Sequence, residues 1–566
     1  VDDSKENRDI RALPNLETKF VAANTLISLE TDSDKKEAVF KSAEVEELEE
    51  KLFAIREKIF YTNSRNEKLK LEKELTHIRE QLKLQLEKDG FSNDKSEKIT
   101  FWNPFDQNTH ADWFDPEWMF GIKDGFDIVI GNPPYIQLQK AYNGNLKYAD
   151  LYKNQSFAVF ERTGDIYCLF YEKGISLLHK GGHLAFITSN KWMRAGYGEK
   201  LRRFFTQYNP KILIDLGPGV FNNATVDTNI LIIQKARNQN NLRAVTVNEK
   251  NKNQLDLAAL LRQNGTQLTN LSADAWFIGS NAEQQLKEKI ERIGKPLKDW
   301  DVNIYRGILT GLNEAFIIDS DKRQEILDHC LDDDERRRTE AVIKPILRGR
   351  DIKRYAYNWA GLWVIGTFPA LHLDIEDYPS LKKYFLDHFD IRQLEQSGKK
   401  YPELGFDARK KTTNEWFETQ DPIAYYPEFE KEKVAFKAVG KNLAFGIIPA
   451  GVMITAPASF MTSSNNKYIL GFLCSKYALY FILNNADKTG AGDVMLNVQS
   501  FEKIPIPPIS AANEPQVRQI ESLVDAILSA KKDNPAADTA ALEQQIDRIV
   551  YRLYDLTEEE IQIVEK

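Results

Sequence analysis

Cysteine and histidine are scarce in this 566-residue chain. The three cysteines, Cys168, Cys330 and Cys474, lie far apart, and the seven histidines form no cluster. This spacing argues against a disulfide framework and against a zinc site. No stretch of about twenty apolar residues occurs, which argues against a membrane span, and the polar, acidic start argues against a signal peptide. We therefore expect a cytoplasmic protein that needs no metal.

Positive charge is not in excess either. The chain has 76 Lys and Arg against 84 Asp and Glu, a net charge of −8. That sign counts mildly against a simple nucleic-acid binder, although a large protein can still concentrate cations on one face. With 42% hydrophobic residues the chain is long enough for two to four domains with their own cores.

One stretch, residues 126–135, points to a chemistry. Residues 127–130 form a short, β-branched apolar run of the kind that makes a fully buried parallel strand, and Gly131 ends it. Pro133 and Pro134 then exclude both a helix and a strand ladder. Because each proline also restricts the residue before it, Asn132 is held extended at the carboxyl end of the strand. Open α/β sheets bind their ligands at that edge.

The turn after this strand offers groups that suit an amine. The Asn132 side-chain oxygen and the Pro133 carbonyl can accept both hydrogens of one exocyclic amine, and Tyr135 offers a flat face to a planar base. Asn132-Pro133-Pro134-Tyr135 closely resembles the catalytic motif of S-adenosylmethionine-dependent amino-methyltransferases, above all those that modify adenine N6 in DNA. The motif is also found in enzymes that methylate protein glutamine or RNA. A proline-capped strand end without function is the plainest alternative.

Upstream, Lys19 to Ile27 reads as a small strand that breaks at Asn24, next to the catalytic strand. In adenine methyltransferases of the γ motif order, an Asp or Asn at this place reads the adenine of the cofactor. The resemblance therefore implies cofactor contacts from Asn24 and Thr25, together with Asn132 and Pro134. A turn-forming Asn explains Asn24 equally well.

A glycine-rich loop for the methionine end of the cofactor precedes this segment in the family, and residues 1–23 contain none. We therefore expect the chain to be the C-terminal part of a longer protein. By itself, this part should bind the cofactor weakly.

Between these two segments, residues 36–88 carry apolar residues three and four positions apart. This spacing predicts two helices that fold back on each other as an antiparallel hairpin, roughly 35 Å long at about 1.5 Å per residue. The hairpin could serve as a spacer, a DNA clamp or a docking arm.

Downstream of the motif, the pattern predicts a helix followed by three strands, over residues 165–178, 183–188, 212–216 and 228–233. The glycine-containing loop 217–223 is not a cofactor loop, because a strand and not a helix follows it. It resembles the late loop of the methyltransferase family, in which an aromatic residue stacks on the flipped target base. Phe221 is the residue at that place.

A second domain begins near residue 298. Its segments 303–319 and 344–355 closely resemble the specificity region of Type IIG restriction-modification and BREX-type methyltransferases. Within them, a basic cluster suits phosphate contacts: Arg348, Arg350, Lys353 and Arg354. Farther on, residues 395–441 interleave lysines, Lys410 and Lys411 among them, with aromatic residues, as in groove-reading surfaces. Ordinary surface charge and β-domain core are the alternatives for the two groups.

The predicted fold is α/β, with a partial Rossmann-like methyltransferase domain and a mixed α/β DNA-recognition domain. The ranges are 1–236 for the catalytic domain with the helical hairpin inserted at 36–88, 237–297 for a bridging segment, 298–510 for target recognition and 511–566 for a helical tail.

The resemblance implies a site-specific DNA methyltransferase of a restriction-modification or phage-defence system, which transfers a methyl group from S-adenosylmethionine to N6 of a flipped adenine. Its partners would be double-stranded DNA and a fused or associated nuclease or other defence subunit. The alternatives are a protein-glutamine or RNA methyltransferase, and a DNA-binding specificity fragment without activity of its own.

Overall fold

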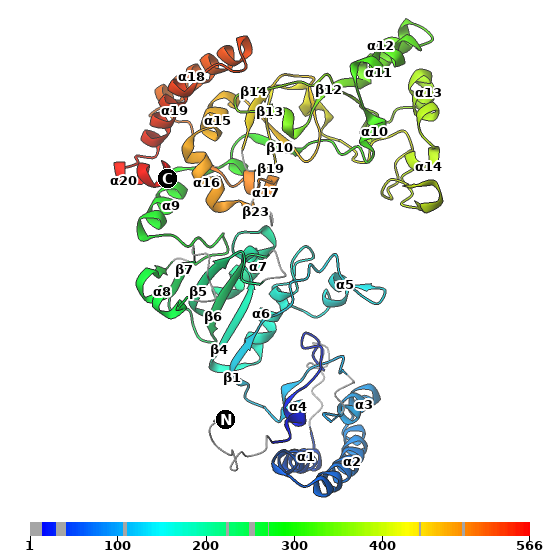
Figure 1. The fold of residues 1–566 in the computed structure, drawn as a ribbon, viewed down its shortest axis with the longest axis vertical. Helices are drawn as coiled ribbons and strands as arrows, with labels where there is room; N and C mark the ends of the chain where they lie inside the picture. The colour runs from blue at the N-terminus through cyan, green and yellow to red at the C-terminus, as the bar shows by residue number, and fades with distance from the viewer. Residues whose placement is uncertain are drawn as a thin grey trace, which may run out of the picture. The chain divides into compact units, whose positions relative to one another are not determined.

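The computed structural model describes residues 14–29, 41–105, 110–221, 226–247, 255–269, 271–440, 443–488 and 493–565. The chain forms two compact units, Val1–Ile278 and Gly279–Lys566. Both mix helices and strands, so the predicted α/β class is confirmed (Figure 1). No helix within the described ranges is long and apolar enough to span a membrane.

A six-stranded sheet forms the centre of the first unit (Figure 1). Its strands, in spatial order, are β1 (Phe126–Gly131), β4 (Leu178–Ser189), β6 (Thr228–Gln234), β5 (Asn209–Gly217), β7 (Leu242–Thr246) and β8 (Thr266–Leu268). β1 and β4 are parallel, as are β5 and β7, whereas β6 is antiparallel to both β4 and β5. Strands β1, β4 and β5 therefore end at the same edge of the sheet, and the strands predicted downstream of the motif are confirmed.

Helices and small strands complete this unit. They are α5 (Tyr148–Tyr152), α6 (Tyr167–Ser176), α7 (Glu199–Phe205), α8 (Leu257–Asn264), β2 (Tyr142–Asn143) and β3 (Leu146–Lys147). Helix α6 connects β1 to β4 and packs closely on the sheet. A Cβ atom on Gly174 of α6 would lie 2.4 Å from the side chain of Leu184 and 3.1 Å from that of Phe186, so only glycine fits there.

The motif strand β1 is an edge strand, and the prediction of full burial is wrong. Among the described strands it pairs with β4 alone. Ile128 and Ile130 are 64% and 80% exposed and, being two residues apart, lie on the same face. A β-branched run predicts a strand that can be buried on both faces. It does not determine whether other helices or strands actually cover those faces.

The segment Lys19 to Ile27 is not a strand, so that prediction is wrong too. A 3-10 helix, Leu16–Lys19, ends where the segment begins, and within the segment the described residues form a single bridge, between Ala23 and Ala111. The Asn24 side-chain oxygen accepts a hydrogen bond from the Leu26 amide at 3.2 Å, which closes a turn. Asn readily forms such turns, and the apolar run around it is too short to form a paired strand. The turn therefore forms in place of the strand.

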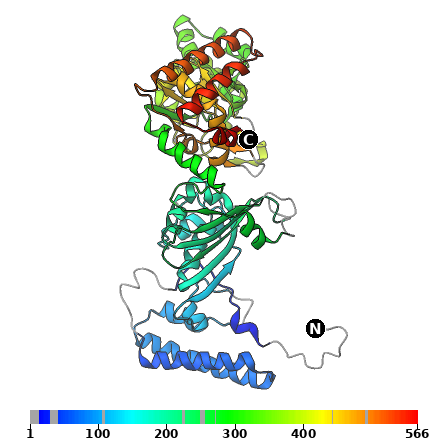
Figure 2. The same ribbon diagram turned by 90° about the vertical axis from the view of Figure 1, so that its left-hand side faces the viewer.

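The predicted helical hairpin is confirmed for its described residues, whereas residues 36–40 lie outside them. It consists of α1 (Ala43–Tyr61) and α2 (Arg65–Lys88), which lie side by side (Figure 2). Ser42 and Ser64 cap the two helices. The apolar seam is buried together with residues from α3 (Asn93–Phe101) and α4 (Pro116–Phe120), so the hairpin shares one core with the segment that leads into β1.

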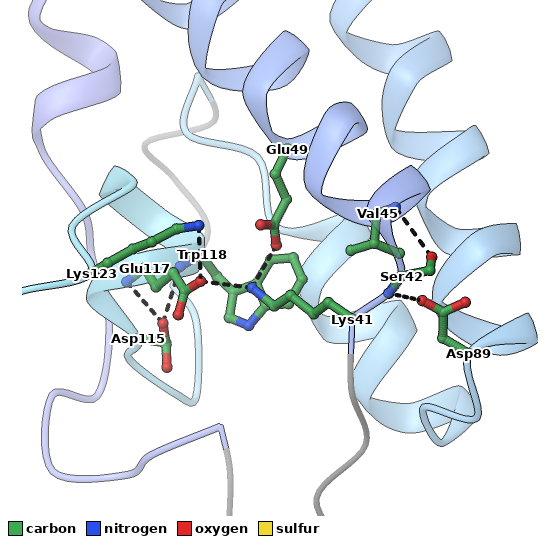
Figure 3. Close-up of polar contacts among 9 residues, drawn as sticks. All are labelled: Lys41, Ser42, Val45, Glu49, Asp89, Asp115, Glu117, Trp118 and Lys123. Carbon is green, nitrogen blue, oxygen red and sulfur yellow. Dashed lines mark hydrogen bonds and ion pairs between the residues drawn. The ribbon is translucent and has the colours of Figure 1, made fainter.

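A lysine fixes the base of the hairpin (Figure 3). Lys41 Nζ lies 2.8 Å from Oε1 of both Glu49 in α1 and Glu117 in α4, and 4.1 Å from the centroid of the Trp118 ring. Burial opposes the charge on Lys41, but the two carboxylates outweigh it and raise the pKa of the lysine. Burial raises the pKa of Glu49 despite the nearby Lys41. The start of α1 is thereby tied to α4, which shortly precedes β1.

Two four-stranded sheets build the second unit. One contains β10 (Val302–Arg306), β22 (Ser459–Ser463), β18 (Lys433–Phe436) and β20 (Phe445–Ile448). The other contains β11 (Ile317–Ile318), β15 (Trp363–Ile365), β12 (Ile343–Leu347) and β21 (Met453–Ile454). Shorter strands are β9 (Lys295–Pro296), β13 (Ile352–Lys353), β14 (Ala356–Tyr357), β16 (Lys400–Tyr401), β17 (Phe406–Asp407), β19 (Val439–Gly440), β23 (Asp487–Lys488), β24 (Val494–Met495) and β25 (Pro505–Ile506).

The helices of this unit fall into two groups. A large apolar core contains residues of α9 (Asn281–Ile293), α15 (Asn466–Leu473), α16 (Lys476–Asn485), α17 (Val498–Phe501), α18 (Glu514–Asp533), α19 (Ala540–Leu553) and α20 (Glu558–Glu565). The others are α10 (Asn313–Phe316), α11 (Ser320–Asp328), α12 (Asp333–Val342), α13 (Pro379–His388) and α14 (Ile391–Leu394). The helices predicted in the tail are confirmed as α18 to α20. The four predicted domain ranges are finer than the division into two units and stay predictions.

Candidate active site and DNA-binding surface

The motif turn lies where β1 ends, against the neighbouring strand. Asn132 and Pro134 are exposed, Pro133 is buried and Tyr135 is half-buried. The Tyr135 hydroxyl donates a hydrogen bond to Asn132 Oδ1 at 2.9 Å and lies 3.3 Å from the carbonyl oxygen of Ile187 in β4. The four motif residues therefore form one compact turn at the carboxyl edge of the sheet.

The hydrogen bond from Tyr135 orients the Asn132 amide. Burial, and to a smaller extent Asp165, raises the pKa of Tyr135 to about 12, so its phenol stays protonated and acts as the donor at neutral pH. An amide oxygen has two lone pairs. Tyr135 takes one, and the other is free to accept a hydrogen from an incoming amine.

Asp165, which precedes α6, also contacts the turn. Its Oδ1 accepts a hydrogen bond from the Ile136 amide at 2.7 Å, and the Ile166 amide donates to the Ile136 carbonyl at 2.9 Å. Burial raises the pKa of the Asp165 carboxyl to about 6. The sequence offers little signal for this role, because an acidic residue ahead of a helix is common without any function.

Polar side chains also join the ends of β4, β5 and β6. Asp215 is buried, and its Oδ1 accepts hydrogen bonds from Asn190 Nδ2 at 2.9 Å and from the Gly217 amide at 3.1 Å. The buried Asn229 Nδ2 donates to the carbonyl oxygen of Ser189 at 3.0 Å. These residues were not predicted as site residues, since each is an ordinary polar residue at a strand end.

Phe221 is half-buried and follows β5. The chain returns from this loop as β6, antiparallel to β5, which confirms that the glycine segment does not run into a helix. The loop continues into residues 222–225, outside the described ranges. Stacking of Phe221 on a target base stays a prediction.

Asn24 and Thr25 are both half-buried in the turn before Leu26. Besides the bond to the Leu26 amide, Asn24 Nδ2 donates to the Tyr152 hydroxyl at 3.4 Å. Leu26 packs into the same core as Tyr135. The turn thus belongs to the sheet unit, and its predicted role in cofactor binding stays a prediction.

The first basic cluster divides into paired and exposed residues. Arg348 forms a two-point ion pair with Asp351, with both nitrogens 2.9 Å from the carboxylate oxygens, and this pairing raises the pKa of Arg348. Arg354 pairs with Glu543 of α19. Arg350 and Lys353 are exposed, and the Lys353 ammonium donates to the Arg350 carbonyl at 2.8 Å.

The second basic group gathers on the small hairpin of β16 and β17. Lys399, Lys400, Lys410 and Lys411 are exposed, and the backbone bond from the Ala408 amide to the Lys399 carbonyl, 2.9 Å, joins the two sides. Arg409 between them is buried and donates to backbone carbonyls, and burial lowers its pKa to about 10. The exposed lysines can contact a ligand, whereas the buried Arg409 stabilises the local fold through its bonds to backbone carbonyls.

The family comparison concerns the catalytic part of the chain. Residues 19–221 match the model of the Eco57I restriction-modification methylase family. The Type II methyltransferase M.BstVI of Geobacillus stearothermophilus is 25% identical over 472 residues, which cover 78% of this chain and 75% of that protein. The Type II restriction enzyme and methyltransferase RM.Eco57I of Escherichia coli is 23% identical, over 82% of this chain and 48% of that protein.

Among solved structures, the Type IIL restriction-modification enzyme MmeI in complex with DNA has a TM-score of 0.50 at 13% identity, over 77% of this chain and 56% of that chain. At this identity the match shows the fold. The chain thus spans three quarters of M.BstVI and about half of RM.Eco57I and MmeI. The predicted resemblance is confirmed: the chain is similar to Type II restriction-modification methyltransferases, and its residues 19–221 match the Eco57I restriction-modification methylase model.

Proposed function

We propose that the protein methylates N6 of adenine in a specific DNA sequence. The observation that carries this proposal is the Asn132-Pro133-Pro134-Tyr135 turn, in which Tyr135 orients the Asn132 amide and leaves an acceptor free at the open edge of the sheet. The similarity to Type II methyltransferases supports DNA as the substrate.

In this mechanism the chain holds the adenine amine and supplies no strong base. Asn132 Oδ1 and the Pro133 carbonyl accept the two N6 hydrogens and direct the nitrogen lone pair at the methyl donor. S-adenosylmethionine, when bound, supplies a methyl group on a sulfonium. Asn132 Oδ1 and the Pro133 carbonyl would stabilise the positive charge that builds on N6 as it takes the methyl group, until a proton leaves N6 to solvent.

The adenine must leave the duplex to reach this turn, because β1 and its turn cannot enter a base stack. Tyr135 presents its ring at the turn, and we infer that Phe221 closes on the other face of the base. Flipping costs unstacking energy, which the aromatic contacts offset.

The residues present fit one side of the cofactor. Asn132 and Pro134 of the turn, with Asn24 and Thr25, would contact it from β1 and the turn before Leu26. On the outer edge of β1, however, the described residues supply neither a paired strand nor a glycine-rich loop. We therefore infer that residues 1–566 by themselves bind the cofactor weakly.

DNA recognition is assigned to the second unit. We infer that Arg350, Lys353, Lys410 and Lys411 contact phosphates or bases, since all four are exposed. Arg348 and Arg354, already ion-paired, contribute mainly by fixing the cluster. The structure of MmeI, to which the fold is similar, is a complex with DNA and supports this assignment.

The test is Asn132→Ala in the complete enzyme. We expect methyl transfer to be abolished while affinity for target DNA in a gel shift stays within about twofold, because Asn132 acts on the amine. The matched control is Asn143→Ala, an exposed Asn in the neighbouring β2. Parallel loss of DNA binding in N132A would show that Asn132 is structural.

A second candidate follows from the open edge of β1: residues 1–566 alone serve as a specificity module without activity. Exposed Ile128 and Ile130 favour it, because a catalytic sheet with helices on both faces would bury them. Sequence-specific DNA binding by this chain without methyl transfer would support it.

A further inference from the structure

Asp165 links the motif turn to the helix that follows it. It lies 29 residues after Ile136 in sequence, yet its carboxylate accepts the Ile136 amide at 2.7 Å. Two further backbone bonds join the same segments: Ile166 donates to the Ile136 carbonyl at 2.9 Å, and Leu138 donates to the Gly164 carbonyl at 3.0 Å. Three hydrogen bonds therefore connect the segment that follows the motif to the start of α6.

The need for such a link follows from where the stiffness of the turn ends. Pro133 and Pro134 restrict the backbone up to Pro134, but Tyr135 and Ile136 have no such restriction. Tyr135 must nevertheless stay in place, because its hydroxyl orients the Asn132 amide at 2.9 Å. The first anchor beyond the prolines is the Ile136 amide, and its partner is Asp165.

A second contact acts on the same residue. The rings of Tyr135 and Tyr167 meet edge to face, with centroids 6.2 Å apart and planes at 89°. Tyr167 is buried and lies two residues after Asp165. The position of the Tyr135 ring thus depends on the start of α6, and Asp165 sets the distance between that start and the turn.

We propose that Asp165 is a positioning residue for methyl transfer: its carboxylate clamps Ile136 and thereby holds Tyr135 and the Asn132 amide in the geometry that the target amine requires. This rests on the proposed function. Asp165 does not touch the substrate, so it changes the rate of the chemical step and leaves DNA affinity unaltered.

An ordinary helix cap would behave differently. The backbone of Ile166 and Tyr167, where α6 begins, also lowers the pKa of the Asp165 carboxyl, and a cap needs only such local contacts. The bond to Ile136 is long-range, and it is the one that reaches the motif. The titratable groups that face the carboxylate are Lys191 after β4, Tyr135 in the turn, and Tyr167 and Cys168 in α6.

The test compares Asp165→Ala with Asp165→Asn in the complete enzyme, by single-turnover methyl transfer to target duplex. D165A should slow transfer about tenfold or more, as loss of one buried hydrogen bond allows, with unchanged DNA affinity. D165N keeps an acceptor oxygen for the Ile136 amide and should stay within about threefold of wild type. Asp150→Ala is the control, because Asp150 is paired to Arg162 on the surface at 2.7 Å.

The experiment distinguishes failure of the proposed function from failure of the positioning role of Asp165. Absence of methyl transfer to DNA by the wild-type enzyme would overturn the proposed function itself. Active wild type with D165A and D165N equally impaired, or with DNA affinity lost in both, would overturn the positioning role. If D165A does not fold, the wild-type to D165N rate ratio decides: it should approach one as the pH falls below about 6, where both side chains are neutral. A ratio well above three at neutral pH, or one that grows as the pH falls, would contradict the clamp.

Discussion

At the residue scale, the site depends on the orientation of one amide. Asn132 is exposed, so nothing in a core packs around it, and its orientation comes from the Tyr135 hydroxyl. The motif and the stiffness that its prolines give to the turn could be predicted from the sequence. The bonds from Tyr135 to Asn132 and from Ile136 to Asp165 could not be, because they depend on how β1, β4 and α6 pack.

The Tyr135 hydroxyl can be separated from its ring. Tyr135→Phe keeps the stacking face but frees the Asn132 amide, so we expect transfer to fall about three- to tenfold while DNA affinity is unchanged. Single-turnover kinetics measure this effect. Tyr208→Phe removes another half-buried hydroxyl of the same unit, on a ring whose centroid lies 5.0 Å from that of Phe204, and serves as the control. Equal rates for Y135F and wild type would mean that only the ring matters.

Asp165 should also affect stability with pH. Burial raises its pKa from 3.8 to about 6, so the folded state binds this proton more tightly than the unfolded state. The carboxylate therefore costs stability above about pH 6, and this cost disappears as the pH falls toward 4. The free energy of unfolding of wild type relative to D165N should rise by about 1–3 kcal/mol between pH 7 and pH 4. Urea unfolding of both proteins at each pH measures it, and an opposite slope would contradict the burial of the carboxyl.

At the element scale, long periodic segments were predictable and local contacts were not. The hairpin helices α1 and α2 follow from apolar residues three and four apart, and Leu52 of α1 and Leu75 of α2 are buried in the core between them. The run 127–130 predicts a strand but not its exposed face, since exposure depends on which elements cover the sheet. For Lys19 to Ile27, one Asx turn at Asn24 decides the outcome.

The anchor at the base of the hairpin can be tested directly. Lys41→Met leaves the buried Glu49 without its cation, so we expect a loss of about 1–3 kcal/mol in the free energy of unfolding at pH 8. The loss should shrink at lower pH as Glu49 takes up a proton. The control is Lys51→Met, which breaks an exposed pair with Glu47 and should leave the free energy of unfolding almost unchanged. Equal losses of unfolding free energy for both variants would show that the Lys41 contacts in Figure 3 do not stabilise the hairpin more than a surface ion pair does.

At the scale of the whole molecule, the proposed function requires an acidic protein to hold an acidic ligand. The net charge of −8 leaves local clusters to provide attraction. If Arg350 and Lys353 contact phosphates, Arg350→Ala with Lys353→Ala should weaken binding to every duplex and lower the slope of log affinity against log salt by about two.

The control for this charge change is Lys382→Ala with Lys383→Ala on α13, where both lysines are paired to acids. Changes at Lys410 and Lys411 should instead alter which sequence is preferred, if these lysines contact bases. An unchanged slope in the Arg350 and Lys353 variant would place the DNA on another face of the protein.

Cofactor affinity is the second property of the whole chain. Because the described residues leave the outer edge of β1 without a partner strand, we expect residues 1–566 to bind S-adenosylmethionine with a dissociation constant well above about 1 μM. Isothermal titration calorimetry measures it. Micromolar or tighter binding would mean that the cofactor needs no further segment at that edge.

The central claim is that the Asn132 turn methylates adenine N6 in DNA. The most direct measurement is mass spectrometry of nucleosides from duplex DNA incubated with the complete enzyme and isotopically labelled S-adenosylmethionine. We predict labelled N6-methyladenine with the wild type and none with Asn132→Ala, although the variant still binds the DNA. Label in another base, in RNA or in protein, or N6-methyladenine at wild-type levels from the variant, would contradict the account.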